Sequence, residues 1–405
     1  MINIAILGYG TVGSGVYEVI RKNGELINKR ATEEICVKYV LDLRDFPGDP
    51  VEKVLTHDYN DILNDPDVKI VVEVMGGLNP AYPFVKNALL AGKSVCTSNK
   101  ELVAKHGPEL LAIAKEKNIN FLFEASAGGA IPVIRPLISA LTSDPVKEIT
   151  GILNGTTNYI LTQMADQGWD FDDALKTAQE LGYAERNPEA DVEGYDACRK
   201  IAILSSLAFG KNVDFEEIYT EGIGRISAQD IAYAKALGRS IKLLASSRCE
   251  DGHYYAMVSP FMIPASHPLY SVCGVYNAIF VNGDCMDDIM FYGSGAGKLT
   301  TASAVVADVV DAAKHMGRNM PVFWDAEKLE LTGVENAVRP FFVRVQGDAD
   351  ARKSEIEALI GDIEIVKVDG IDGEFGFVTK AMAEKDFEAV YDKIDGTITR
   401  IRLEK

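Results

Sequence analysis

The chain begins with the apolar run Ile2-Asn3-Ile4-Ala5-Ile6-Leu7 and continues into Gly8-Tyr9-Gly10-Thr11-Val12-Gly13. The second stretch fits the pattern G-x-G-x-x-G, between a predicted strand and a predicted helix over 13–22. In a dinucleotide-binding fold such glycines allow a tight turn, a close approach to the pyrophosphate and close packing of helix on strand. The helix N-terminus, with Thr11 and Val12, adds amide donors for the phosphates. The alternative is a glycine-rich turn without a ligand.

The segments that follow alternate between strand and helix patterns over roughly the first 125 residues. This alternation is typical of a parallel sheet with crossover helices, so we predict a Rossmann dinucleotide-binding domain over 1–130. An alanine-rich helix within 300–325 is expected to return and complete this domain. The predicted strands are 2–7, 35–41, 69–75, 94–97 and 120–124, and the predicted helices are 13–22, 83–91 and 107–118.

Two further domains are expected in the rest of the chain. Long helices over 172–181 and 194–209, followed by strand-like stretches, predict an α+β catalytic and dimerisation domain over 131–299. The segment 338–405 alternates strands and helices in the order βαββαβ, which predicts a ferredoxin-like module of the ACT-like regulatory type. The predicted fold class is therefore α/β with three domains.

Charge and composition exclude several classes of function. With 41 basic and 60 acidic residues, the net charge of −19 argues against nucleic acid or a membrane surface as the main partner. The apolar runs are too short to span a bilayer, and the N-terminal stretch does not resemble a signal peptide. The six cysteines are dispersed without metal-ligand spacing, which predicts reduced thiols in a cytoplasmic protein.

The second predicted strand ends in Val40-Leu41-Asp42-Leu43-Arg44-Asp45, the place where a dinucleotide-binding fold contacts the ribose of the cofactor. An acid at this place accepts hydrogen bonds from a ribose 2′-hydroxyl, and an arginine meets a 2′-phosphate. Both residue types are present, so the sequence leaves NAD and NADP open.

The stretch Gly151-Ile152-Leu153-Asn154-Gly155-Thr156-Thr157-Asn158-Tyr159 places small and hydroxyl residues before a predicted helix. Free amides at such a helix start hold a carboxylate. The alternative is an ordinary helix N-cap by Thr156 or Thr157.

Asp196 and Lys200 lie four residues apart on the predicted helix 194–209 and continue its apolar stripe of Ile203, Leu204 and Leu207. Charges on a core-facing stripe must be paired or line a cleft. We therefore predict a functional pair, the alternative being an exposed ion pair.

Lys100 follows the end of a predicted strand, where ligands of open α/β sheets bind, although a solvated lysine at a helix start explains it as well.

The run Glu124-Ala125-Ser126-Ala127-Gly128-Gly129-Ala130-Ile131 follows another strand end. Its backbone carbonyls suit a monovalent cation, with Glu124 supplying charge. A hinge between domains explains the same small residues equally well.

Taken together, these stretches resemble homoserine dehydrogenase over nearly all of 1–325. The resemblance is carried by GYGTVG, by TSNKELVA around Lys100 and by EASAGGAIP at 124–132. It is carried further by GILNGTTNYIL at 151–161, GYAERNPEADVEGYDACRK at 182–200 and FYGSGAGKLTTASAVVAD at 291–308.

The resemblance implies an NAD(P)-dependent oxidoreductase that interconverts L-homoserine and L-aspartate 4-semialdehyde by direct hydride transfer, on the route to threonine and methionine. It implies that Lys200 is the catalytic lysine, that Asp196 is its helix partner and that Lys100 lies beside the nicotinamide. It also implies that Glu185 holds the substrate amino group. The other matching substrate positions are Gly155, Thr156, Tyr183 and Asp191.

The same resemblance implies where the cofactor and a sodium ion bind. Arg44 matches an arginine that often accompanies NADP use, and the family leads us to expect a homodimer or homotetramer. The implied sodium positions are Glu124, Ala127, Gly129 and Ile131. The implied cofactor positions are Gly8, Gly10, Thr11, Val12, Gly13, Arg44, Thr97, Ser98, Lys100 and Gly295.

Two stretches depart from the family pattern. The late glycine loop reads Gly293-Ser294-Gly295-Ala296-Gly297 where a proline is usual, which keeps the glycines. The C-terminal module has Val345-Gln346-Gly347-Asp348-Ala349-Asp350 where a Pro-Gly turn is usual, which puts threonine feedback through this module in doubt.

Two alternatives to this function remain at the level of the sequence. Cys96, three residues before Asn99, is a candidate covalent nucleophile toward an aldehyde, although no histidine lies near it in the sequence. The other alternative is a non-catalytic sensor of dinucleotide and amino acid, in which the acid–lysine cluster only binds its ligand.

Overall fold

The computed structural model describes residues 1–404, which divide into two compact units. Unit 1 consists of Met1–Pro145, Ala202–Phe215 and Phe291–Leu329. Unit 2 consists of Val146–Ile201, Glu216–Met290 and the chain from Glu330 onward. The three predicted domain ranges, 1–130, 131–299 and 338–405, stay a prediction.

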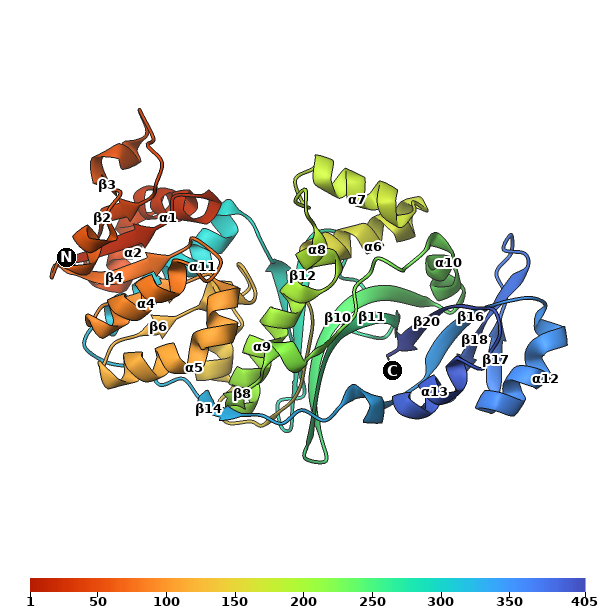
Figure 1. Cartoon of the computed structure of the whole chain (residues 1–405). Helices are drawn as coiled ribbons and strands as arrows, with labels where there is room; N and C mark the ends of the chain where they lie inside the picture. Colours follow the sequence, from red (N-terminus) through yellow and green to blue (C-terminus); the bar gives the residue numbers. More distant parts are fainter. Residues whose placement is uncertain (405) are drawn as a thin grey trace. The chain divides into compact units, whose positions relative to one another are not determined.

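Unit 1 is built on a parallel sheet, as predicted for a Rossmann domain (Figure 1). Its six strands have the order β3-β2-β1-β4-β5-β6, and all neighbouring pairs are parallel. The apolar runs are buried because helices cover both faces of such a sheet. The strands are β1 (Ile2–Leu7), β2 (Ile35–Leu41), β3 (Leu55–Thr56), β4 (Val68–Glu73), β5 (Ser94–Thr97) and β6 (Phe121–Leu122).

The helices of unit 1 include α11 (Lys298–Lys314), which packs on α1 (Thr11–Lys22). Gly15 permits this contact, because a Cβ there would lie 2.6 Å from the backbone oxygen of Lys298. Ala302, Val305 and Val309 of α11 belong to the buried core around β1. The other helices are α2 (Gly24–Ala31), α3 (Tyr59–Leu63), α4 (Ala81–Leu90) and α5 (Lys100–Glu116), and a short β8 (Lys211–Asn212) pairs with β14 (Asp325–Lys328).

In unit 1 the predicted start of one helix was wrong, and another helix was not predicted. Helix α5 begins at Lys100, seven residues before the predicted start at 107, because the side chain of Asn99 caps it by accepting the amide hydrogen of Leu102 at 3.1 Å. It also continues through Pro108. Helix α2 follows α1 directly and was not predicted, because its polar sequence GELINKRA carries little periodic signal.

Unit 2 contains a ten-stranded mixed sheet with the order β13-β12-β7-β10-β11-β20-β16-β18-β17, and β9 joins it at β11. Its strands include the long hairpin β10 (Arg239–Glu250) and β11 (His253–Pro264), β7 (Val146–Ile152), β9 (Tyr219–Thr220), β12 (Tyr276–Gly283) and β13 (Asp288–Ser294), whose residues from Phe291 onward belong to unit 1. Its helices before residue 240 are α6 (Gly155–Gln167), α7 (Phe171–Glu180), α8 (Glu189–Val192), α9 (Tyr195–Phe209), which continues into unit 1, and α10 (Ala228–Ala236).

The C-terminal part of unit 2 has the predicted βαββαβ order. Its strands lie in the order β20-β16-β18-β17 with antiparallel neighbours, which is the ferredoxin-like topology. Phe341, Phe377 and Phe387 form the centre of its core. No observation identifies it as an ACT domain, so that name stays a prediction. The elements are β16 (Phe341–Gln346), α12 (Ala349–Ile360), β17 (Ile363–Val366), β18 (Glu374–Thr379), α13 (Glu384–Tyr391) and β20 (Thr397–Leu403), with β15 (Val338–Arg339) paired to β19 (Met382–Ala383).

Strand β20 also joins this module to the rest of the sheet, because Phe261 of β11 pairs in parallel with Arg402.

Among residues 1–404, no helix has the length and apolar character needed to cross a membrane.

Candidate active site

The strongest site prediction concerned Asp196 and Lys200, which lie together near the start of α9. Nζ of Lys200 donates a hydrogen bond to Oδ2 of Asp196 at 2.7 Å. Asp196 is 4% exposed and Lys200 is 9% exposed, so this is not an exposed surface pair. The helical spacing therefore correctly placed both charges on the buried side of the helix.

Lys200 also donates to the backbone oxygen of Leu153 at 2.7 Å. An ammonium group has three N–H donors, so these two bonds leave one donor for a further oxygen. Asp196 and Leu153 fix the direction in which this donor points. A buried cation held in this way can stabilise an oxyanion and can deliver a proton to it.

Asn154 connects this pair to Asp191, a role that no sequence pattern indicated. Nδ2 of Asn154 donates to Asp191 at 2.7 Å and to Asp196 at 2.9 Å. Its Oδ1 accepts the amide hydrogen of Thr157 at 2.9 Å, so Asn154 is the N-cap of α6. The alternative of a cap by Thr156 or Thr157 was therefore wrong. One buried amide thus caps the helix and holds two carboxylates.

The remaining predicted substrate residues lie on the segments next to this cluster. Oγ1 of Thr156 donates to the backbone oxygen of Tyr183 at 2.6 Å, which joins the start of α6 to the loop after α7. Gly155 leaves room for the backbone oxygen of Val275, which a Cβ would approach to 2.7 Å. Glu185 is exposed on the same loop as Tyr183. The structure therefore brings Asp191, Asp196 and Lys200 into one hydrogen-bonded network, but it does not link the Glu185 carboxylate to it.

The glycine loop of unit 1 has the backbone geometry that a pyrophosphate requires. Gly8 has φ +97°, a conformation that favours glycine. A Cβ at Gly13 would lie 1.9 Å from the backbone oxygen of Gly8, whereas a Cβ at Gly10 would meet nothing within 4 Å. No side chain caps the start of α1 at Gly10. The loop therefore exposes backbone at its tip, with the N-terminus of α1, Thr11 and Val12 behind it, and its geometry fits a dinucleotide.

Asp42 and Arg44, at the end of β2, form a pair. Nε of Arg44 donates to Oδ1 of Asp42 and Nη2 to Oδ2, both at 2.9 Å. The amide of Tyr9 in the glycine loop donates to Oδ2 of Asp42 at 2.8 Å. These contacts, above all the Arg44 guanidinium, hold the pKa of Asp42 well below its usual range. Arg44 thus compensates the negative charge of Asp42, while the Arg44 side chain itself stays 62% exposed.

Thr97, Ser98 and Lys100 surround the start of α5. Thr97 is fully buried, and its hydroxyl donates to the carboxylate of Glu73 at 2.6 Å. A cofactor contact by Thr97 would therefore come from its backbone. Glu73 also accepts the amide of Met75 at 2.8 Å, so it organises this strand end, which sequence reasoning missed. Lys100 is the first residue of α5 and, like Ser98, is partly buried.

The proposed sodium positions lie around the short 3-10 helix Glu124–Ser126. The carboxylate of Glu124 accepts the amide hydrogens of Val133, Ile134 and Arg135 at 2.7–2.9 Å. Its charge is therefore already compensated by backbone donors. A cation at this place would be held by backbone oxygens of Ala127, Gly129 and Ile131, and the sodium site stays a prediction.

Gly295 lies against this same segment, in contact with Gly129. A Cβ at Gly129 would lie 2.1 Å from the backbone oxygen of Gly295, and Gly129 has φ +60°. The amide of Ala130 donates to the backbone oxygen of Ser294 at 3.2 Å. The late glycine loop thus packs closely although it lacks the usual proline.

Cys96 is the residue of the alternative covalent mechanism. It lies within β5 and is fully buried, and burial raises the pKa of its thiol well above the usual value. A nucleophilic cysteine requires the opposite, a partly exposed thiol with a lowered pKa. The structure therefore argues against covalent catalysis by Cys96.

Comparison with known families and proteins gives a consistent result. Residues 132–310 match the family model of homoserine dehydrogenase, and residues 8–124 match the model of the homoserine dehydrogenase NAD binding domain. The homoserine dehydrogenase of Neisseria gonorrhoeae is 36% identical, over 100% of this chain and 98% of its own length. That of Synechocystis is 46% identical over 76% of this chain and 73% of its own length.

Solved structures agree with these sequence matches. A homoserine dehydrogenase from Thiobacillus denitrificans superposes with a TM-score of 0.91 at 37% identity, over 100% of this chain and 98% of that one. The S. aureus homoserine dehydrogenase at pH 7.5 gives a TM-score of 0.83 at 34% identity, over 100% and 98%. A hyperthermophilic archaeal homoserine dehydrogenase in complex with NADPH gives 0.68 at 28% identity, over 80% and 99%. These relatives carry the name of an enzyme, which supports catalysis over the sensor alternative.

Proposed function

Because the chain belongs to the homoserine dehydrogenase family, we propose that it interconverts L-homoserine and L-aspartate 4-semialdehyde with Lys200 at the reacting oxygen. The protein is an NAD(P)-dependent oxidoreductase that acts on a small molecule. The observation that carries the assignment to Lys200 is its buried ammonium, which uses two donors on Asp196 and Leu153 and keeps one for substrate.

Bound NAD(P) supplies the hydride acceptor for homoserine oxidation and the hydride donor for the reverse reaction. In aldehyde reduction, Lys200 stabilises the negative charge that develops on the carbonyl oxygen and then donates its proton to form the hydroxyl. In homoserine oxidation, the proton passes from the substrate hydroxyl to the neutral amine of Lys200. Asp196 keeps the amine directed at that oxygen in both directions.

The other predicted residues bind and orient the substrate in this proposal. Glu185 and Asp191 are carboxylates suited to the substrate ammonium group, and the amide-bearing start of α6 at Gly155 and Thr156 suits its carboxylate. Lys100 adds a second positive charge beside the reacting carbon. Tyr183 closes the site beside Thr156.

Asn154 is expected to control the position of Lys200 through Asp196. We expect Asn154→Asp to lower kcat roughly 10²-fold, because it keeps the helix-capping oxygen but replaces the amide donor with a third carboxylate beside Asp191 and Asp196. Steady-state kinetics and thermal unfolding together check this, with Asn154→Ala, which loses the cap as well, expected to lower Tm further. Full activity in Asn154→Asp would show that the amide does not position the pair.

Arg44 is expected to select the cofactor, and we propose that this enzyme prefers NADP. Arg44→Ala removes the exposed guanidinium that suits a 2′-phosphate and frees the Asp42 carboxylate for a ribose hydroxyl. We expect the KM for NADP to rise about tenfold and the KM for NAD to stay constant or fall. The exposed Arg30 on α2 provides the control variant Arg30→Ala. An equal change for both cofactors would contradict the assignment.

The direct test of the activity is the appearance of reduced nicotinamide absorbance with L-homoserine and each cofactor, with and without L-threonine. Turnover with homoserine supports the proposal. Dinucleotide binding without turnover with either cofactor would instead favour the sensor alternative. A homodimer or homotetramer, a sodium requirement and a cytoplasmic location remain parts of the proposal that separate measurements must test.

A further inference from the structure

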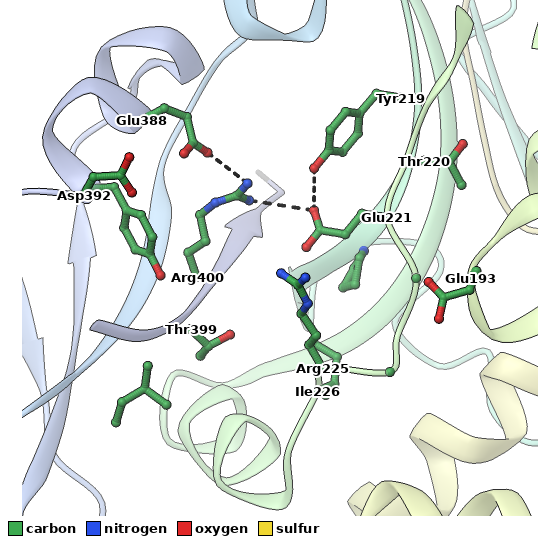
Figure 2. Close-up of a pocket in the computed structure, with 15 residues that line it drawn as sticks. Glu193, Tyr219, Thr220, Glu221, Arg225, Ile226, Glu388, Asp392, Thr399 and Arg400 are labelled. Atoms are coloured by element: carbon green, nitrogen blue, oxygen red, sulfur yellow. Dashed lines mark hydrogen bonds and ion pairs between the residues drawn. The ribbon is translucent and has the colours of Figure 1, made fainter. Parts of the chain in front are cut away.

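Ion pairs compensate several charged side chains of unit 2, but not that of Lys242. Arg400, for example, has its Nη2 2.9 Å from Oε1 of Glu388, in a cavity beside the C-terminal module (Figure 2). Lys242 of β10 is 2% exposed, and its partners among residues 1–404 are a backbone oxygen, an amide and a sulfur. Burial lowers the pKa of its ammonium group. A larger share of Lys242 than of an exposed lysine is therefore the neutral, nucleophilic amine.

The amine of Lys242 lies beside the thiol of Cys273, in the loop after β11. Nζ donates to the backbone oxygen of Val272 at 2.6 Å and lies 3.4 Å from Oδ1 of Asn158. It is also 3.8 Å from Sγ of Cys273, within the range of a hydrogen bond to sulfur. Cys273 is exposed, whereas Lys242 is buried. A thiol that dissolved reagents can reach is thus in contact with a buried amine.

The loop that carries Cys273 is fixed on both sides of the thiol. Nδ2 of Asn158 donates to the backbone oxygen of Val272 at 3.3 Å, and the amide of Gly274 donates to Oγ1 of Thr162 at 3.0 Å. Asn158 and Thr162 both belong to α6. The sulfur is therefore held next to the amine, and such positioning accelerates a reaction between two groups over the same reaction in free solution.

We propose that Cys273 is a site of oxidation by hydrogen peroxide, and that Lys242 captures the oxidised thiol in a nitrogen–sulfur bond. In the first step the sulfur attacks one peroxide oxygen. A sulfur–oxygen bond forms, the oxygen–oxygen bond breaks, and the other oxygen leaves as water with the thiol proton. The thiol is thereby oxidised to a sulfenic acid, and the peroxide is reduced.

The second step is a condensation without further oxidation. The lone pair of Nζ attacks the sulfur, the sulfur–oxygen bond breaks, and the hydroxyl group leaves as water with one proton from the nitrogen. The product is a sulfenamide that links Lys242 to Cys273. An added thiol reverses the link, because it attacks the sulfur, releases the amine and forms a disulfide that a second thiol reduces.

The link is expected to affect the start of α6, where the proposed substrate residues lie. The loop after Cys273 packs on this helix, because a Cβ at Gly155 would lie 2.7 Å from the backbone oxygen of Val275. Bonding to sulfur also withdraws Nζ from Val272 and Asn158. We expect the KM for homoserine to rise about fivefold, an expectation that rests on the proposed function.

Mass spectrometry of the full-length protein after treatment with hydrogen peroxide and proteolytic digestion tests the proposal. We expect the peptides of Lys242 and Cys273 to be joined, with the pair lighter by two hydrogen atoms, and dithiothreitol to separate them. The exposed Cys285 is the control within the same chain. Its sulfur lies 3.9 Å from Oδ2 of Asp284, a carboxylate that cannot form such a link, so we expect only unlinked oxidation there.

Two variants separate the role of the thiol from that of the amine. Cys273→Ser should keep the activity of the untreated enzyme and lose both the link and the effect of peroxide on KM. Lys242→Met should leave Cys273 open to oxidation but without the link. This variant should fold, because it removes a buried charge and the backbone oxygen of Val272 still accepts a hydrogen bond from Asn158.

The absence of joined peptides in the treated wild type, with Cys273 unmodified or oxidised without a link, would overturn the proposal. A linked protein with unchanged KM for homoserine would overturn the connection to α6, as would an equal rise in KM in treated Cys273→Ser. The mass measurement requires no turnover, so its failure is distinguishable from failure of the proposed enzymatic function.

Discussion

Replacement of Lys200 by alanine is expected to lower kcat for homoserine oxidation by about 10³-fold while the affinity for the dinucleotide stays unchanged. The reason is that Lys200 places a buried N–H donor next to Asp196, where the reacting oxygen is proposed to bind. The glycine loop that holds the dinucleotide belongs to unit 1, whereas Lys200 belongs to unit 2. Steady-state kinetics together with fluorescence titration of the reduced cofactor measures the two effects separately.

Lys176→Ala is the matched control, because Lys176 is an exposed helix lysine on α7 and should tolerate the change. Removing Lys200 also leaves Asp196 buried without its cation, which can destabilise the fold. Lys200→Met with Asp196→Asn in the same chain avoids this buried charge and should be equally inactive. Near-normal turnover in a folded Lys200 variant would refute the assignment.

Gly13→Ala is expected to abolish dinucleotide binding and to lower the free energy of unfolding by about 1–3 kcal/mol. A Cβ at Gly13 would lie 1.9 Å from the backbone oxygen of Gly8, so the loop and the start of α1 must move apart. The backbone amides proposed to bind the pyrophosphate then lose their arrangement. Thermal unfolding and a titration with NADP measure both effects.

Variants at two other glycines distinguish a steric clash within the protein from a steric clash with the cofactor. Gly10→Ala should keep the stability of the wild type but lose affinity for NADP, because a Cβ at Gly10 meets no protein atom within 4 Å and would face the pyrophosphate. Gly24→Ala, where a Cβ also meets nothing, should change neither property. Normal NADP binding by Gly10→Ala would contradict the proposed position of the cofactor.

Local patterns predicted much of the fold because they report on the immediate neighbours of a residue. The strands 35–41 and 94–97 were predicted with the observed bounds, since short apolar runs between turn residues define buried strands. The start of α5 was misplaced, because it depends on one side-chain cap, from Asn99, rather than on periodicity. Helix α2 buries only Ile27 and Ala31, a stripe too short to be recognised from periodicity.

In the candidate site, too, contacts between residues close in the sequence could be predicted, and contacts between distant residues could not. Asp196 and Lys200 were predicted as a pair because a helix places residues four apart on one face. The link from Asn154 to Asp191 joins residues 37 positions apart in the chain, and no sequence spacing indicates it. The polar stretch GILNGTTNYIL was the one available signal, and it suggested Thr156 or Thr157, rather than Asn154, as the helix cap.

The most direct test of the account is a crystal structure of the enzyme with NADP and L-homoserine. We predict that Nζ of Lys200 lies within hydrogen-bond distance of the substrate hydroxyl, with Asp196 still bound to Lys200 and the nicotinamide ring facing the carbon that bears the hydroxyl. Homoserine bound away from Lys200, or Lys200 directed into solvent beside an ordered cofactor, would contradict the account.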